Sequence, residues 1–384
     1  MEQLIPLDYS TLRVVWWALL GALLVGFAVM DGFDLGVATV LPLVARSDIE
    51  RRVVINVVGP VWEGNQVWLI TGGGAAFAAW PLVYASAFSG FYLAMMLLLI
   101  ALILRPVGFK YRSKLEAPRW RSAWDAVLCG SGLVAALVFG VAVGNLVVGV
   151  PFGFDSQTMR PLYEGNFFGL FTPFPLLSGL LSVCMLAMHG CTLLMWKTDA
   201  AVAARARTVG ICFALACLVL FALGGWWVAH GLPGYVVTSA IDPDQLSNPL
   251  AKTVAVSAGA WMHNYARWPA MWIAPALGLG GALLAAALLA LRRAALAFIA
   301  SVLSVAGIVL TFGFSMFPFL MPSLLTPNAS LTVWDASSSR MTLWIMLLVT
   351  AVLLPIVSIY TAWVYRVMRG KVTQAALGDS PHAY

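Results

Sequence analysis

Long apolar stretches separated by short polar segments dominate the chain. An apolar run of about 20 residues is long enough to cross the hydrocarbon core of a bilayer as a helix. Nine stretches of this kind predict membrane-spanning helices at residues 12–42, 53–79, 82–104, 123–149, 171–196, 208–229, 269–290, 295–319 and 342–365. The pattern therefore predicts an all-α polytopic membrane protein, with residues 1–384 forming a single transmembrane domain.

The polar segments between these stretches predict how the chain is oriented. Arginine and lysine are enriched in the cytoplasmic loops of membrane proteins. If the N-terminus lies outside, 17 of the 22 basic residues fall in segments that face the cytoplasm. We therefore expect the N-terminus outside, the C-terminus in the cytoplasm and the longest outside loop at residues 230–267.

The composition excludes several classes of protein. Hydrophobic residues make up 61% of the chain and charged residues only 10%, whereas a soluble domain has about 25% charged residues. So few charges cannot cover a surface that faces water, which excludes a soluble enzyme and a disordered protein. The net charge of +6 does not indicate a nucleic-acid partner, because the basic residues lie in short loops between apolar stretches. We expect lipid around the chain and no nucleic acid.

Three carboxylates interrupt the first two predicted spans. They are Asp31, Asp34 and Glu63, and an ionisable group at membrane depth costs at least ~2.5–3.5 kcal/mol. Asp31 and Asp34 are three residues apart, which places them on one face of a helix, and Gly32 and Gly36 permit another helix to approach closely. Apart from Arg13 at the outer start of the first span, neither span contains a lysine or arginine. Some of these acids must therefore be protonated, hydrated, or paired with a cation or a partner chain.

Further polar side chains surround Glu63. Trp62, Asn65 and Gln66 add an indole N–H and two amides to this carboxylate. One interpretation is a proton relay or an ion site. The alternative is a hydrogen-bonded cluster that only fixes how the helices pack.

A lone histidine, His189, lies in the middle of the span 171–196. It is either a haem ligand or a packing residue with satisfied hydrogen bonds. The chain contains no pair of histidines, or of histidine and glutamate, at a spacing typical of a metal site. We therefore predict no metal site built by this chain alone and no catalytic residue.

Several blocks of sequence are specific enough to compare with a known family. The chain contains MDGFDLGV, PVWEGNQVWLITGGG, LRPVGFKYRSK, GNFFGLFTPFP and NASLTVWDASSS. Together these blocks closely resemble subunit II of the cytochrome bd-type quinol oxidases. The resemblance extends from about residue 10 to the last residue and is greatest to the proteobacterial branch that oxidises ubiquinol.

The resemblance implies a respiratory enzyme of the bacterial inner membrane that oxidises quinol and reduces dioxygen to water. Haems b and d would lie on a partner, subunit I, and protons would come from the cytoplasm. This chain would be a nine-helix subunit built as two four-helix bundles plus one helix. A small single-helix accessory subunit would accompany the two large ones, and some members of the family bind a structural ubiquinone on subunit II.

The resemblance also implies roles for individual residues. Glu63 occupies the acidic position of a motif in which many members have aspartate, and Asp34 would lie near it. Both match a proposed proton path, with Tyr384 at its cytoplasmic entrance and Asp31 beside Asp34. Lys110 stands where close relatives carry an acid, and a cation at a channel mouth disfavours the accumulation of protons.

Three hypotheses follow from these observations. The first is an oxidase subunit that conducts protons through buried carboxylates to subunit I. The second is an ion-coupled secondary transporter in which Asp31, Asp34 and Glu63 bind the coupling ion. The third is a pure structural scaffold for subunit I. Neutral variants of the acids distinguish the first hypothesis from the third.

Overall fold

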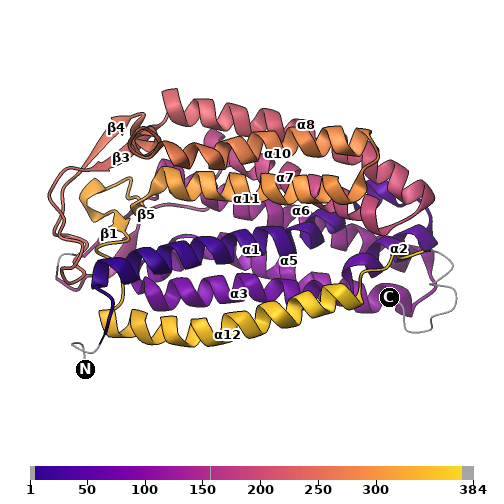
Figure 1. Cartoon of the computed structure of the whole chain (residues 1–384), viewed down its shortest axis with the longest axis horizontal. Helices are drawn as coiled ribbons and strands as arrows, with labels where there is room; N and C mark the ends of the chain where they lie inside the picture. Colours follow the sequence, from indigo (N-terminus) through magenta and orange to yellow (C-terminus); the bar gives the residue numbers. More distant parts are fainter. Residues whose placement is uncertain (1–4, 156, 374–384) are drawn as a thin grey trace.

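A computed structural model describes residues 5–155 and 157–373 and shows a bundle of long helices that run along one axis (Figure 1). Within these residues, eight helices are long and apolar enough to cross a membrane. They are α1 (Tyr9–Val44), α5 (Tyr92–Tyr111), α6 (Pro118–Val148), α7 (Pro173–Lys197), α8 (Ala200–His230), α10 (Ile273–Ala290), α11 (Ala294–Met316) and α12 (Arg340–Val367).

The second and third predicted spans are each divided in the structure. The segment 53–79 is broken at Gly59-Pro60, where proline lacks the N–H that a continuous helix needs, into α2 (Asp48–Val58) and α3 (Trp62–Ala79). The segment 82–104 is divided into α4 (Pro81–Gly90) and α5. Helices α3 and α4 meet at a bend of 120° and are long and apolar enough to form a membrane span only when they are taken together. The described residues therefore contain eight spans, or nine with this bent pair.

Helix α1 lies at the centre of the bundle and packs against α3, α6, α7 and α11. Its backbone approaches that of α7 most closely at two glycines. A Cβ atom on Gly36 would lie 1.9 Å from the carbonyl oxygen of Leu186, and one on Gly190 would lie 2.5 Å from the amide nitrogen of Val37. The expected close approach of a helix at Gly36 is therefore confirmed.

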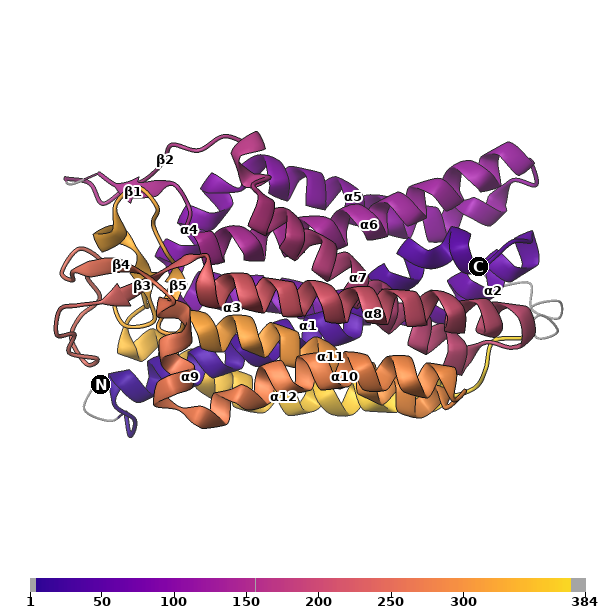
Figure 2. The same cartoon turned by 90° about the horizontal axis from the view of Figure 1, so that it is seen from above.

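The other helices surround α1 in two groups. Helix α7 packs against α8, α8 against α10, α10 against α11 and α11 against α7, which closes a ring of four (Figure 2). Helix α5 packs against α6 on the other side. Helix α12 lies along α1 and α3 at the edge of the molecule (Figure 1), and Leu343 is its one buried residue.

Three short antiparallel hairpins gather at the end of the bundle where α1 begins, and we call this the strand end (Figure 1). The sequence pattern did not predict them. They pair β1 (Phe152–Phe154) with β2 (Pro161–Tyr163), β3 (Pro233–Val237) with β4 (Val254–Ala258), and β5 (Phe319–Met321) with β6 (Leu331–Thr332). Short helical turns complete the fold: η2 (Arg112–Lys114), η3 (Phe168–Leu170), η4 (Ala260–Met262), α9 (His263–Arg267), η5 (Pro269–Trp272) and η6 (Pro327–Ala329).

Buried charges fasten the long segment 231–262 to the rest of the strand end. Arg13 is fully buried and donates hydrogen bonds to the carbonyls of Pro243 and Gln245 and to the hydroxyl of Ser247. Lys252 forms a buried ion pair of 2.8 Å with Asp335. Burial raises the pKa of Asp335 and lowers that of Lys252, while the attraction between the two charges opposes both shifts. The pair therefore holds this segment against the start of α12.

The charged loops gather at the opposite end of the molecule, which we call the basic end (Figure 1). It consists of residues 45–47, 112–117, 198–199, 291–293 and 368–373. Here Arg112 binds both Asp125 and Asp48, at 2.5 and 2.9 Å. These ion pairs connect the start of α2 with the turn between α5 and α6.

Candidate functional site

A buried ion pair joins α1 to α5 within the bundle. The Nη2 atom of Arg105 donates a hydrogen bond of 2.7 Å to Oδ1 of Asp31, and neither side chain is exposed. The sequence pattern ended the third span at residue 104 and counted Arg105 as a loop residue, which was wrong. Helix α5 continues to Tyr111, because apolar residues resume after the arginine. The counter-charge that α1 and α3 lack therefore comes from α5.

A chain of hydrogen bonds links the second acid of α1 to α3 and α12. Asn65 donates from Nδ2 to Oδ2 of Asp34 at 2.9 Å. The hydroxyl of Tyr365 donates to Oδ1 of the same amide at 2.7 Å. Asp34 is fully buried and Asn65 nearly so. Three helices thus fix the position of one carboxylate, and the sequence analysis did not single out Tyr365.

Several polar atoms of this cluster have no hydrogen-bond partner among the described residues. They are Oδ2 of Asp31, Oδ1 of Asp34, and Nε and Nη1 of Arg105. Buried polar groups without partners are rare in native proteins and are often satisfied by ordered water. The unpaired atoms include both acceptors and donors, so the cluster has the chemistry to bind water, a proton or a small polar group.

The charges of the cluster do not balance. Two carboxylates, Asp31 and Asp34, accompany one guanidinium, that of Arg105. A dry site cannot hold an uncompensated negative charge without a large cost. The cluster is therefore neutral only when one proton, or another cation, is bound in addition to Arg105. We call Asp31, Asp34, Asn65 and Arg105 the acid cluster.

The predicted supporting residues lie around the acid cluster. Gln66 accepts a long hydrogen bond of 3.4 Å from Nη2 of Arg105. The ring of Trp62 lies 5.8 Å from the guanidinium carbon of Arg105, within the range of a cation–π interaction. Trp62, Asn65 and Gln66 all begin α3, so one turn of helix supplies the polar support that the sequence indicated.

Glu63 lies outside the acid cluster. Its side chain is exposed and forms no ion pair or hydrogen bond with any residue in the described part of the chain. It begins a stripe of exposed positions on α3 that continues with Val67, Ile70, Gly74 and Phe77. These positions are three or four residues apart and therefore share one face of the helix. The structure thus separates Glu63 from the two aspartates.

The sequence analysis also named Tyr384 and Lys110 at the cytoplasmic entrance of the proposed proton path. Tyr384 lies outside the described residues. Lys110 is exposed at the end of α5, one helical turn or more beyond Arg105.

His189 is a packing residue in this structure. Its Nε2 atom donates to the carbonyl of Val29 at 3.0 Å, because a carbonyl can only accept. Its Nδ1 atom lies 2.8 Å from the hydroxyl of Ser301, and the ring of Phe298 stacks on it at 5.0 Å. Both ring nitrogens are occupied. No group of three or more metal-ligating side chains is present in residues 5–155 and 157–373.

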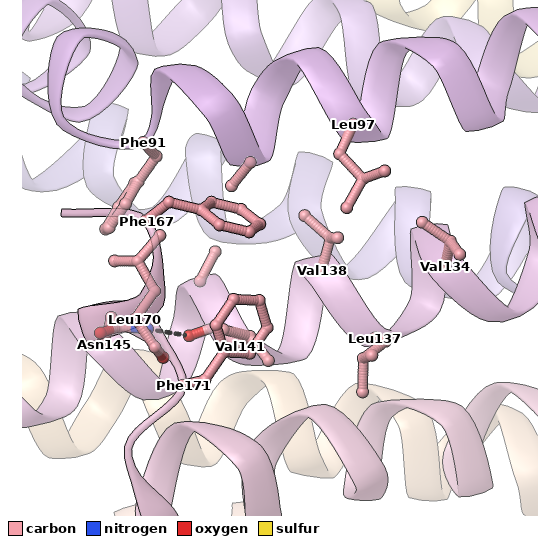
Figure 3. A pocket seen from close by; sticks show the side chains of 12 residues that line it. Phe91, Leu97, Val134, Leu137, Val138, Val141, Asn145, Phe167, Leu170 and Phe171 are labelled. Carbon is pink, nitrogen blue, oxygen red and sulfur yellow. Dashed lines mark hydrogen bonds between the residues drawn. The ribbon is translucent and has the colours of Figure 1, made fainter.

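A separate cavity of about 150 Å³ lies between α5, α6 and the segment 167–171 (Figure 3). Aliphatic side chains and the rings of Phe91, Phe167 and Phe171 line it. The one polar residue in its wall is Asn145. Both hydrogens of that amide are already donated, to the carbonyls of Val141 and Leu170 at 2.8 and 2.9 Å. The cavity is therefore suited to hydrocarbon.

Comparison with known proteins gives a consistent family. Residues 12–368 match the model of the family described as cytochrome bd terminal oxidase subunit II. Cytochrome bd-I ubiquinol oxidase subunit 2 of Escherichia coli (strain K12) is 50% identical over 98% of this chain and 99% of the relative. A probable cytochrome oxidase subunit 2 of Haemophilus influenzae is 48% identical over the same shares.

The fold has a solved counterpart. A chain in the structure of bd oxidase from Geobacillus thermodenitrificans matches 94% of this chain and 100% of its own length with a TM-score of 0.68. The sequence identity is 18%, so this similarity concerns the fold alone.

Proposed function

Because the chain belongs to the family of cytochrome bd terminal oxidase subunit II, we propose that its acid cluster takes up protons and delivers them toward subunit I. As subunit II, the chain is part of an oxidoreductase complex of the bacterial inner membrane whose haems belong to the partner subunit. Family membership decides against the transporter hypothesis. The relative from E. coli is a ubiquinol oxidase, so we propose ubiquinol as the electron donor.

The observation that carries the proton proposal is the charge balance of the acid cluster. Asp31 and Asp34 are both buried and share one cation, Arg105. One excess proton makes the group neutral, and its release leaves a charge that draws in the next proton. A site of this kind alternates between two states without moving a helix.

The hydrogen bonds of the acid cluster indicate from which side protons would reach it. Tyr365 lies near the end of α12 and contacts Asn65, which contacts Asp34. Asn65 orients the carboxylate, and the unpaired Oδ1 of Asp34 is the atom that takes the proton. The basic end faces the cytoplasm by the positive-inside rule. We place the entrance there, with Tyr384 as the proposed first residue.

Glu63 would act at the surface between the two large subunits. A carboxylate on the outer face of a membrane helix is costly against lipid and is expected to meet protein or water. The stripe that it begins carries Val67, Ile70 and Phe77, which are 46–68% exposed. We propose that subunit I covers this stripe and receives protons at Glu63.

The helix packing supports a proposed arrangement of the whole subunit. Helices α7, α8, α10 and α11 would form one four-helix bundle, and α1, α3, α5 and α6 the other. Helix α12 would be the ninth, with the N-terminus outside and the C-terminus in the cytoplasm. The proposal also includes the small single-helix accessory subunit that the family resemblance implies.

A bound ubiquinone would place its hydrocarbon tail in the cavity between α5 and α6. The walls of this cavity offer hydrocarbon contact throughout, and the amide of Asn145 has no hydrogen left for a quinone carbonyl. The ring would therefore lie outside the cavity. Such a quinone has a structural role in this proposal.

The test uses neutral variants of the acids in the purified complex. Asp34→Asn and Glu63→Gln keep the size of the side chain and remove the proton that titrates. We expect ubiquinol-driven oxygen consumption and proton uptake in liposomes to fall on the order of 10²-fold, with haem content unchanged. Glu116→Gln, which neutralises an exposed acid at the basic end, should have no effect.

The scaffold hypothesis predicts a different result. If the acid cluster only holds helices together, Asp34→Asn removes an unbalanced charge and turnover stays at the wild-type level. That outcome would overturn the proton proposal and leave the family assignment intact.

A further inference from the structure

A recess at the basic end contains cations that no other part of the proposal uses. It has a volume of about 370 Å³ and lies where α7 ends, α8 begins and α10 turns into α11. Its charged residues are Arg207, Arg292, Lys371 and Asp199. The last two form an exposed ion pair of 2.9 Å. The recess therefore has a net charge of +2.

The two arginines are available to a ligand. The side chains of Arg207 and Arg292 form no ion pair or hydrogen bond with another described residue. Four other arginines near this end, Arg51, Arg112, Arg121 and Arg205, are held in ion pairs. The first turn of α8 also lines the recess, and no side chain caps it. Free N–H groups at the start of a long helix add to the attraction for an anion.

The backbone at Arg292 gives independent support. This residue connects α10 to α11 with a φ angle of 60°, in the left-handed region where glycine or asparagine is favoured. Glycine is the usual residue at such a position after a helix. Here an arginine takes the left-handed conformation instead, and its side chain lines the recess.

The surroundings of the recess favour a lipid over a soluble anion. Ala294 lines the recess at the start of α11. Further along α11, Leu296, Ile299 and Leu303 form an exposed apolar stripe at 53%, 55% and 41% exposure, on the face of the helix opposite Ala294. The outer side of α11 therefore faces lipid next to the recess. The recess itself lies at the basic end, which the positive-inside rule places at the cytoplasmic leaflet, where anionic phospholipids are found.

We propose that this recess binds the phosphate of one anionic phospholipid of the surrounding membrane, held by Arg207 and Arg292. Lys371 connects the site to the segment that follows α12, since it lines the recess and pairs with Asp199. The lipid would thus fasten three separate parts of the chain at the membrane surface. This inference is independent of the proton proposal, because no residue of the acid cluster takes part.

The experiment measures lipid retention by the whole complex. The complex is placed in nanodiscs of phosphatidylcholine that contain roughly 10–20% phosphatidylglycerol as the anionic lipid. The complex is then extracted, and the lipids that stay bound to it are identified by native mass spectrometry. We expect one phosphatidylglycerol to remain bound in the wild type. Each arginine near a membrane surface contributes about fivefold in affinity, so Arg207→Gln with Arg292→Gln should lower retention about 25-fold.

The control removes the same charge from the same end. Arg293 and Arg366 are exposed and lie outside the recess, so the double variant Arg293→Gln with Arg366→Gln should retain the lipid. Haem content reports whether each complex has assembled. Arg292→Gly adds a second test, because it relieves the left-handed backbone and should lose lipid without loss of stability.

Two outcomes would overturn the inference. One is equal retention by the recess variant and the control variant. The other is retention of phosphatidylcholine as strong as that of phosphatidylglycerol, together with binding of inorganic phosphate at millimolar concentration, which would identify the recess as a site for a soluble anion.

Discussion

At the scale of single residues, Arg105 decides the electrostatics of the bundle. It is the cation beside Asp31 and Asp34, and its side chain is fully buried. Only its Nη2 atom has hydrogen-bond partners among the described residues. The guanidinium is therefore held at one nitrogen, and its other two nitrogens are buried without a hydrogen-bond partner among the described residues. This geometry suits a guanidinium that stabilises Asp31 and Asp34 while the protonation of these carboxylates changes.

Removing one partner of the Asp31–Arg105 pair should cost more than removing both. Arg105→Gln leaves a second buried carboxylate uncompensated, and breaking a buried pair in this way costs about 3–5 kcal/mol. In the double variant with Asp31→Asn, most of this loss should be recovered. Chemical unfolding of the complex in detergent checks the difference. Equal losses in the single and double variants would show that Arg105 acts through packing alone.

At the scale of helices, the contact between α1 and α7 depends on the absence of side chains. The two backbones touch at Gly36 and Gly190, and Gly36 lies five residues after Asp31 and two after Asp34 on α1. This contact fixes the rotation of α1 and so the direction in which both acids point. The packing of α1 is therefore part of the site.

A methyl group at Gly36 should disturb this contact. Its Cβ atom would lie 1.9 Å from a backbone oxygen of α7, so the helices must separate, at a cost of about 1–3 kcal/mol. Gly21→Ala on the same helix is the matched control, since a Cβ atom there has no neighbour within 4 Å. The midpoint of thermal unfolding should fall for Gly36→Ala only. A fall of similar size in both variants would contradict this reading of the contact.

Hydrophobic runs could predict the helices but not where each one ends. The arginine at position 105 closed the third run, yet the residues after it are apolar again and the helix continues to Tyr111. Gly59-Pro60, where the second run is broken, was visible in the sequence. The whole run is long enough for a single span, however, so the pattern predicted one helix where the structure has two. The hairpins have strands of two to five residues, which are too short for an alternating pattern to appear.

The members of the acid cluster were predicted unevenly for a similar reason. Asp31 and Asp34 are conspicuous because a charge in an apolar run is rare. Tyr365 is not, since a tyrosine near the end of a span is typical of the membrane interface. The outward position of Glu63 depends on the rotation of α3, which follows from the packing of Asn65 against Asp34.

At the scale of the whole molecule, one side of the bundle is left uncovered. Along α12 only Leu343 is buried, and the adjoining face of α3 carries Glu63 in place of a purely apolar surface. An all-lipid environment would disfavour that carboxylate. The side formed by α3 and α12 is thus the expected place for subunit I.

Cross-linking in the assembled complex tests this placement. A photoreactive phenylalanine derivative at Ile70, which is 68% exposed on α3, should form a covalent product with subunit I. The same group at Leu284 on α10, which is 48% exposed, should not. Products identified by mass spectrometry decide the result. A cross-link to subunit I from Leu284 and none from Ile70 would place the interface on the other side.

The ion pair between Asp31 and Arg105 has a consequence for how the chain is made. The two residues are 74 positions apart, so at about 5–20 residues per second the ribosome needs roughly 4–15 s to supply the arginine after the aspartate. During that interval α1 has two acids and no cation beside them. Its insertion must therefore be delayed, or sheltered by the translocation machinery, until α5 emerges. Helix α1 is the first helix to be synthesised but would be among the last to reach its final position in the bundle.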